Sequence, residues 1–497
     1  MQIKLTIREL APPQLQFGGA AATSDPKIGL GLAGPFDLRF GAARQTQVKV
    51  GIIGPRFLVE QAERWLERCR TVIPVLGEPS LLQKPFPGFK KAFHMDLVSS
   101  DGWNVVVKDT ALDEALSESD PFAAFQKVVD IYSDAHGGLA SRDANRPDVV
   151  LICLADEVQK RLRSVERNLT AEERKKAKAL AKARESRQMD MFDMLQDVEQ
   201  TEEDFLKRDL RHALKARAMA NKLPIQIVTQ RLLIDGPNSE DPATRAWNFC
   251  VGLYYKAGNV PWRLPTDGPE TCFVGISFHH FRTTQRHIVQ STLAQAFSSE
   301  GEGFAIRGEG VPADPDQRRN LHLSEEQAYK LCGSVLAEYQ QRTGGAPLRM
   351  VVHKTSFFDE AERAGFGAAL RDIPVVEMVT LVPSAFRLIR FGMYPPKVGT
   401  LCSVNDARDY LFTSGFMPEL GTYPGPHVPQ PFEVRRLGDG DHISAAQDVL
   451  NLTRMNWNTA DIRGKWPVTL SFARRVGGIL DEYGEAGAPV TSFRYFV

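Results

Sequence analysis

An apolar strand followed at once by an amphipathic helix constrains the fold of this chain most. Residues 47–55 (QVKVGIIGP) are rich in apolar side chains and end in Gly-Pro, which predicts a buried strand that stops at a turn. Residues 57–70 predict a helix with one apolar face, formed by Leu58, Ala62, Trp65, Leu66 and Cys69. A second apolar strand is expected at 148–157. Strand, helix and strand in this order are typical of a parallel, Rossmann-like α/β sheet.

The second half of the chain predicts further strands and helices. Residues 272–278 and 349–354 favour central strands, and residues 321–344 favour a helix that ends at a Gly-Gly pair. A Pro-rich stretch at 259–270 predicts the boundary between the halves. We therefore expect three regions, which are an N-terminal strand and connector (1–45), a first domain (46–265) and a second domain (266–497).

Two segments do not fit the regular pattern. Gly29, Gly31 and Gly34 spell GxGxxG, but a dinucleotide loop needs a helix directly after it, and Pro35 follows instead. A turn-rich connector is therefore expected here. Residues of about 158–205 are highly charged and rich in helix formers, which favours a solvated helical insertion in the first domain. A disordered linker or a partner-docking arm is the alternative.

Composition excludes some classes of protein. Lys+Arg and Asp+Glu both total 61, so any attraction for nucleic acid must be local or shared with a partner. No apolar stretch is long enough for a membrane span, and the N-terminus alternates like a strand instead of forming a signal peptide. The six cysteines form no CxxC pair, which predicts reduced thiols in a cytoplasmic protein and neither a zinc site nor a disulfide framework.

Four polar residues between 208 and 262 suit a terminal phosphate. Arg211 and Lys215 are four apart and share one helix face, and Gln226 lies on the strand that follows. Lys256 ends an apolar helix just before a glycine turn. A phosphate calls for Lys or Arg as charge partners and an amide donor to fix its orientation. Taken alone, the same four residues also fit an ordinary polar surface.

The order of these residues resembles the MID domain of Argonaute proteins. In that family a tyrosine, histidine or arginine, a lysine, a glutamine and a second lysine hold the 5′ phosphate of a guide strand. The resemblance gives these roles to Arg211, Lys215, Gln226 and Lys256. The usual Gly-Gly after the second lysine is replaced by Ala257-Gly258-Asn259, and an arginine loses the ring that stacks on the first base. His212 is the adjacent candidate for that stacking.

The resemblance also implies a metal. In many prokaryotic members the C-terminal carboxylate reaches a divalent cation beside the phosphate. The chain ends in SFRYFV, so the carboxylate of Val497, together with Gln226, is the expected ligand set for a structural Mg²⁺. Oxygen ligands beside a phosphate are what this ion prefers.

The second half resembles a PIWI domain, which has an RNase H-like fold. The segment CFVGISF resembles its first strand, RMVVHKTSFFDEAERAGF its central strand and helix, and the run from TRMNWN to WPVTLSFA its last segment. Cleavage by two metal ions about 4 Å apart needs clustered carboxylates. The positions that the family fills with such ligands are Ser277, Lys354 and, near the end, Phe472. We therefore expect no intrinsic cleavage.

Other catalytic sites have less support. His279-His280 lack further metal ligands at useful spacing, which favours ordinary histidines. No GxSxG or GxxxxGK[ST] occurs.

Taken together, the features resemble a short prokaryotic Argonaute without N-terminal and PAZ domains. Such proteins bind a small guide RNA, pair it with complementary invading single-stranded DNA, and activate an associated APAZ-domain protein. That partner carries a TIR or sirtuin-like NADase or a nuclease, and the pair forms a heterodimer that can oligomerise on activation. The expected outcome is antiviral defence by abortive infection. Two alternatives stay open, which are an active guide-directed endonuclease and an RNase H-like scaffold that binds only protein.

Overall fold

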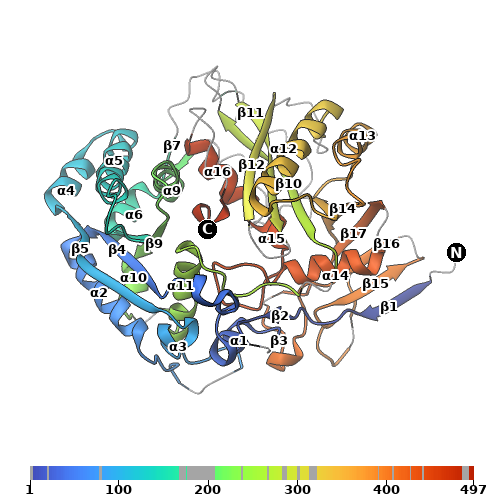
Figure 1. Cartoon of the computed structure of the whole chain (residues 1–497), viewed down its shortest axis with the longest axis horizontal. Helices are drawn as coiled ribbons and strands as arrows, with labels where there is room; N and C mark the ends of the chain where they lie inside the picture. Colours follow the sequence, from blue (N-terminus) through green and yellow to red (C-terminus); the bar gives the residue numbers. More distant parts are fainter. Residues whose placement is uncertain are drawn as a thin grey trace.

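Two sheets organise the chain, and each forms one half of the molecule in the computed structural model (Figure 1). The helical insertion predicted at about 158–205 lies almost wholly outside the described residues. Only its start is described, as α6 (Asp156–Leu162) and β7 (Ser164–Glu166), which pairs with β8 (Lys207–Asp209). The structure describes residues 4–19, 22–77, 81–166, 175, 207–236, 239–265, 268–282, 288–298, 303–312, 322–389, 391–405, 408–425, 427–438, 441–483 and 492–497.

The smaller sheet has the parallel order β5-β4-β6-β9. Its strands are β4 (Gln47–Pro55), β5 (Asp96–Val107), β6 (Val149–Leu154) and β9 (Ile225–Thr229). Successive side chains of a strand point to opposite faces. In β6, Val149, Leu151 and Cys153 join one hydrophobic cluster, whereas Val150, Ile152 and Leu154 join another. Both faces are therefore buried, which confirms the Rossmann-like expectation.

Helices cover both faces of this sheet. The five apolar residues predicted for the face of the first helix are all buried in α2. The helices of this half are α2 (Arg56–Arg70), α3 (Phe89–Phe93), α4 (Asp109–Ser117), α5 (Pro121–Ala140), α9 (Leu210–Ala220), α10 (Gln230–Leu233) and α11 (Pro242–Lys256).

The larger sheet has nine strands in the order β1-β15-β16-β17-β14-β13-β10-β11-β12. They are β1 (Leu5–Glu9), β10 (Thr271–Arg282), β11 (Ile288–Ser298), β12 (Gly303–Pro312), β13 (Arg349–Lys354), β14 (Val375–Pro383), β15 (Thr400–Val404), β16 (Arg408–Leu411) and β17 (Phe432–Gly438). Its helices are α12 (Glu325–Thr343), α13 (Glu360–Ala369), α14 (His442–Leu452), α15 (Val468–Ser471) and α16 (Ala473–Tyr483), with the short η2 (Pro418–Leu420) and η3 (Phe493–Tyr495). The helix predicted at 321–344 is α12, which begins with a capping box at Ser324 and ends at Gly344, a residue in the left-handed conformation.

The N-terminal region departs from the expectation. The predicted strand is β1, but it pairs antiparallel with β15 and so forms the edge of the larger sheet. The predicted turn-rich connector is wrong, because α1 (Pro26–Ala33) is a helix capped by Asp25, and η1 (Phe36–Ala43) follows it. A Cβ on Gly29 would lie 2.1 Å from the Phe17 ring, so this glycine permits close packing of α1 and does not form a phosphate loop. The short strands β2 (Leu15–Gln16) and β3 (Ala22–Thr23) lie beside this helix.

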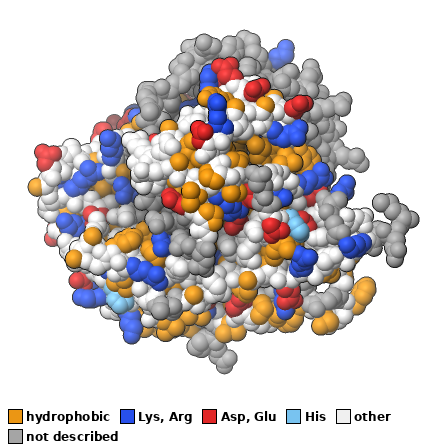
Figure 2. Space-filling view, turned by 45° about the vertical axis from the view of Figure 1, so that its right-hand side comes forward, with side chains coloured by type: hydrophobic (Ala, Val, Ile, Leu, Met, Phe, Trp, Pro, Cys, Tyr) orange, Lys and Arg blue, Asp and Glu red, His pale blue; other side chains and the backbone are white. Residues whose placement is uncertain are grey.

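The cysteines, the helices and the surface charges can each be compared with the composition. All six cysteines are buried free thiols. Among the described helices, none has the length and apolar character that a bilayer span requires. Figure 2 shows Lys and Arg side chains scattered among acidic and hydrophobic side chains on the face drawn there. On this face the basic side chains are therefore not gathered into one continuous surface (Figure 2).

Candidate nucleic-acid interface

The start of α9 presents the first two predicted phosphate ligands. The Asp209 carboxylate caps this helix by accepting from the backbone N–H groups of Arg211 and His212. Arg211 is exposed in the first turn, and Lys215 is half-buried one turn later. Helix N-termini favour anions and disfavour cations. Arg211 and Lys215 therefore do not stabilise the start of the helix, and we interpret them as residues that bind an anion.

The end of the chain lies beside Lys215. The Lys215 ammonium donates to a Val497 carboxylate oxygen at 2.9 Å and to the Phe496 carbonyl at 3.1 Å. Val497 is buried, and Figure 1 shows the C-terminus among α9, α11 and α16. The structure thus brings Val497 to the group of predicted ligands, across 282 positions of sequence.

The end of α11 brings Lys256 to this group. Gly258 has φ +94°, a conformation that side chains disfavour, and the chain turns away from the helix there. Trp262 anchors the turn, because it is fully buried and its indole N–H donates to the Arg454 carbonyl. Lys256 is only 3% exposed, and its ammonium donates to Oε1 of Gln226 on β9.

A fourth cation, Arg475, reaches the group from α16 in the other half of the molecule. Burial, together with the nearby Arg475 charge, lowers the pKa of Lys256 to about 7. Burial also lowers the pKa of Lys215 well below its usual value, and Lys256, Arg475 and Arg211 add to the effect. Among the described residues, none of these four cations forms an ion pair with an Asp or Glu side chain. We call Arg211, Lys215, Lys256 and Arg475 the cation cluster.

Sequence reasoning did not find Arg475, although it follows the WPVTLSFA segment by two positions. The resemblance places Phe472 of that segment where the family has an Asp or His ligand of a catalytic metal. The guanidinium lies 5.1 Å from the centre of the Phe472 ring. A signal existed in the basic pair that follows Ala473, but nothing local links that pair to α9.

His212, the alternative candidate for base stacking, packs against α16. A Cβ on Gly478 would lie 2.5 Å from Nδ1 of His212, so this glycine allows the imidazole to approach the helix closely. Arg211 is therefore the more exposed of the two side chains.

The TRMNWN segment, noted for its resemblance, lies along α11. Asn248 accepts from the Thr459 hydroxyl at 2.7 Å and from the Ala460 N–H at 3.1 Å. The Trp457 ring contacts the Tyr255 ring with centroids 4.9 Å apart. A Cβ on Gly252 would be 3.4 Å from Oδ1 of Asn458 and 3.7 Å from Oε1 of Gln226. Asn458, which sequence reasoning also missed, therefore borders the group next to Gln226.

The donor atoms suit Mg²⁺ only in the presence of a phosphate. A Val497 carboxylate oxygen and Gln226 Oε1 are oxygen ligands of the kind this ion takes. Each already accepts from a lysine ammonium, which would repel a bare divalent cation. A bound phosphate would supply the missing negative charge, and Val497 and Gln226 would then be the residues that hold the ion.

Ser277 and Lys354, two of the positions where the resemblance expects catalytic ligands, lie on neighbouring parallel strands, Ser277 in the middle of β10 and Lys354 at the end of β13. Ile276 of β10 is level with Lys354 of β13, so Ser277 follows directly beside Lys354. The Ser277 hydroxyl oxygen is buried and has no hydrogen-bond partner among the described residues. Phe472 is also buried and packs on Phe493, with ring centroids 5.3 Å apart.

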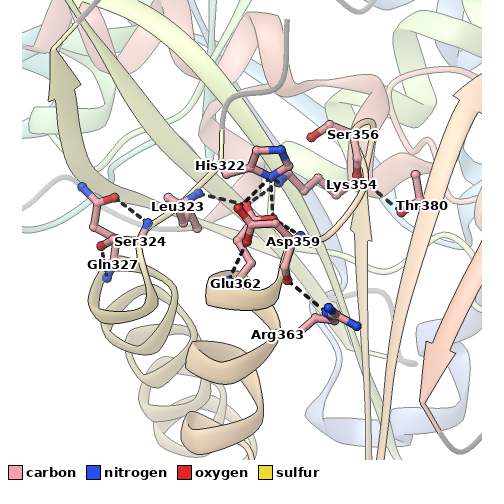
Figure 3. A network of polar contacts seen from close by, with 10 residues as sticks. All are labelled: His322, Leu323, Ser324, Gln327, Lys354, Ser356, Asp359, Glu362, Arg363 and Thr380. Atoms are coloured by element: carbon pink, nitrogen blue, oxygen red, sulfur yellow. Dashed lines mark hydrogen bonds and ion pairs between the residues drawn. The ribbon is translucent and has the colours of Figure 1, made fainter. Parts of the chain in front are cut away.

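Lys354 has its own internal counter-charge (Figure 3). The lysine is 1% exposed, and its ammonium donates to Glu362 at the start of α13. Nδ1 of His322 lies 3.0 Å from the other oxygen of Glu362. The rings of Phe278 and Phe358 lie 5.6 Å from the ammonium. The pKa of Lys354 is lowered by burial, which outweighs the attraction of Glu362.

Glu362 of this ion pair also belongs to a group of three residues of the types that bind metal ions. The ligand atoms of His322, Asp359 and Glu362 lie within 4.8 Å of one another. Because the Lys354 ammonium already contacts Glu362, the cation of this group comes from the protein itself. His279 and His280 lie on β10, but their side chains are outside the described part of the chain.

Comparison with solved structures identifies the fold that carries these sites. The chain resembles the Argonaute of Clostridium butyricum bound to a guide DNA and a target DNA, with a TM-score of 0.61, 13% identity, and coverage of 99% of this chain and 55% of that one. It resembles the Argonaute of Aquifex aeolicus with a TM-score of 0.53, 15% identity, and coverage of 99% and 57%. It also resembles an Argonaute with externally bound siRNA, with a TM-score of 0.56, 16% identity, and coverage of 99% of this chain and 56% of that one.

The chain therefore has the fold of Argonaute MID and RNase H-like PIWI domains. It spans about half the length of the solved Argonautes that it matches. No protein-family model and no curated protein matches it.

Proposed function

We propose that the chain is a short prokaryotic Argonaute, which acts as a guide-dependent nucleic-acid sensor in immunity. The observation that carries the proposal is the cation cluster in a fold of the Argonaute type, in which two lysines and two arginines converge and the Val497 carboxylate contacts one of them, Lys215. Four cations beside one carboxylate leave an excess of positive charge that is costly to bury, so such a group is expected where an anionic ligand supplies the compensation.

The 5′ phosphate of a small guide RNA is the proposed ligand. Lys215 and Lys256 would neutralise its charge, and Gln226 would orient it through its amide group. Arg211 and Arg475 would bind from the two sides of the junction between the halves. With the phosphate in place, Val497 and Gln226 would hold a structural Mg²⁺, whose charge would help to neutralise the phosphate.

Target recognition is proposed to occur without cleavage. Complementary single-stranded DNA would pair with the guide, by analogy with the Clostridium butyricum Argonaute, whose solved structure holds a guide DNA and a target DNA. Ser277, Lys354 and Phe472 replace the carboxylate or histidine ligands of the family's active members, and the Lys354 ammonium would repel a metal ion. The effector chemistry would then belong to another protein.

That protein is proposed to be an APAZ-domain partner bound as a heterodimer, with a TIR or sirtuin-like NADase or a nuclease. Target binding would activate it, and NAD⁺ depletion or DNA degradation would stop growth of the infected cell. A balanced charge fits a nucleic-acid channel that is completed by a second protein.

Binding of labelled RNA to the purified chain tests the proposal. We expect RNA with a 5′ phosphate to bind more tightly than the same RNA with a 5′ hydroxyl. The loaded chain should then bind complementary DNA and leave it intact in Mg²⁺ or Mn²⁺. Equal binding of the two RNAs would contradict the phosphate site, and guided cleavage by the chain alone would contradict the proposed loss of catalysis.

A further inference from the structure

A loop leaves the larger sheet at the same end as Lys354. Strands β10, β13 and β14 are parallel, so their carboxyl ends lie at one end of the sheet. Thr380 of β14 is level with Lys354, and β14 continues for three more residues to Pro383, or about 10 Å. The β14–β15 loop, residues 384–399, begins there. Arg390 lies outside its described part.

The middle of this loop exposes large apolar side chains. Phe391 is 95% exposed, and Ile389, Met393 and Tyr394 are each more than half exposed. Single exposed apolar residues are ordinary, but several within six positions mark a contact surface for another molecule.

Aromatic contacts fix both ends of the loop. Phe386 stacks on Tyr410 with ring centroids 4.4 Å apart, and Tyr394 stacks on Phe416 with centroids 4.7 Å apart. Further on, the Lys397 ammonium lies 3.0 Å from the Glu9 carboxylate of β1. The exposed residues are therefore presented from an anchored segment.

The charge of the loop favours an anionic ligand. Its sequence contains Arg387, Arg390 and Lys397 but no Asp or Glu. Lys397 pairs with Glu9, whereas Arg387 donates to the Ser384 and Phe386 carbonyls and, among the described residues, has no carboxylate partner. At the same end of the sheet, the Arg435 guanidinium pairs with Glu433 and lies 4.3 Å from the centre of the Phe357 ring, which is partly exposed. Aromatic side chains interleaved with cations are how proteins hold unpaired nucleotides, because bases stack on the rings and phosphates meet the cations. A purely apolar protein surface would not require the cations.

We propose that the β14–β15 loop binds unpaired nucleotides of the target strand, next to the segment that pairs with the guide. A base stacks on Phe391, and Arg387 lies near the backbone phosphates. Bases inside a duplex are covered on both faces, so an exposed ring has no place there, and the ligand that we infer is the single-stranded extension. The assignment to the target strand rests on the proposed function, whereas the affinity for single strands does not.

The test compares targets with and without single-stranded extensions on the guide-loaded chain. We expect a target that extends beyond the guide to bind about tenfold more tightly than one that ends with it, as one stacked base would provide. Extensions on each side of the paired segment are measured separately. The variant Phe391→Ala should lose this advantage, and Phe391→Trp should keep it.

Leu32→Ala is the matched control, because Leu32 is 81% exposed on α1 in the other half of the molecule. It should keep the advantage of the extended target. A fluorescent base analogue placed in the extension gives a second reading, because stacking on Phe391 quenches it in the wild type and not in Phe391→Ala.

Failure of the loop and failure of the proposed function are distinguishable. If no guide binds, the proposed function fails, and the loop is then tested by binding single-stranded DNA to the unloaded chain with the same variants. Unchanged affinities in Phe391→Ala would overturn the loop proposal. If that variant instead loses a protein that co-purifies with the wild type, the loop is a protein-docking site and the proposal is also overturned.

Discussion

Lys256 and Lys354 are both almost completely buried, but they differ in what compensates their charge. Lys354 contacts the Glu362 carboxylate, so the fold supplies its counter-charge. Among the described residues, Lys256 donates to the Gln226 amide oxygen, has no carboxylate partner and lies near further cations. A compensated lysine serves the folded protein itself, whereas an uncompensated one has a role only when an anion arrives. Lys354 is thus part of an internal ion pair, whereas Lys256 belongs to the cation cluster.

The difference has energetic consequences. Breaking a buried ion pair leaves one uncompensated charge and strongly destabilises a fold. Removing one cation from a group of like charges removes repulsion instead. Substitutions in the two regions should therefore affect different measurements, which are stability near Lys354 and ligand affinity near Lys256.

The largest expected effect is on guide binding. Lys215→Glu with Lys256→Glu should weaken binding of 5′-phosphorylated RNA by about 3–6 kcal/mol, or more than a hundredfold, because each charged contact contributes about 1.5–3 kcal/mol. Titration with labelled RNA measures this loss, and a thermal melt checks that the variant is folded. Lys90→Glu with Lys91→Glu on α3 is the control. A folded variant with unchanged affinity would rule out the site.

The second effect is on stability. Glu362→Gln keeps the shape of the side chain but removes the charge opposite Lys354, and should lower the free energy of unfolding by about 3–5 kcal/mol. Lys354→Met with Glu362→Leu should cost much less, since neither charge stays buried. Urea unfolding measures both. If the single and double variants had the same free energy of unfolding, the burial of the Lys354 charge would not depend on the Glu362 carboxylate.

The third prediction concerns the arginine that only the structure revealed. Arg475→Ala should weaken binding of 5′-phosphorylated RNA by about ten- to a hundredfold, as expected for one charged contact. Binding of 5′-hydroxyl RNA should change little. Stability should be unchanged or slightly higher, because a like charge leaves the cluster. A clear loss of stability with full affinity would mean that Arg475 has a structural role.

The smallest effect is on pH dependence. Because the pKa of Lys256 falls from 10.5 to about 7 on folding, the unfolded chain holds a proton between these values that the folded chain has released. Stability of the free protein should therefore rise with pH through this window. A bound phosphate favours the charged lysine, so affinity should fall above pH 7, by at most about tenfold per unit.

Lys256→Arg provides the control for the pH effect, because a guanidinium stays charged throughout this range. Its affinity for 5′-phosphorylated RNA should vary less between pH 7 and pH 9 than that of the wild type. Equal slopes in the two proteins would show that another group titrates.

The sequence by itself determined the elements and part of the candidate site. Short apolar runs predicted β4 and β6, and the apolar face of α2 was predicted correctly, because both signals lie within a few neighbouring residues. The spacing of Arg211, Lys215 and Gln226 likewise follows from one helix and the next strand. The prediction of a turn-rich connector before residue 45 was wrong, because it gave more weight to three glycines than to the helix start at Asp25-Pro26.

Only the tertiary structure decided which distant groups meet. Arg475 and Val497 join Lys215 after more than 250 intervening positions, and β1 pairs with β15 across nearly 400. The Glu362 partner of Lys354 is only eight positions away, but the turn between β13 and α13 sets that contact. Local periodicity fixes which face of an element is buried. Whether a buried lysine has a carboxylate or waits for a phosphate depends on which faces pack together.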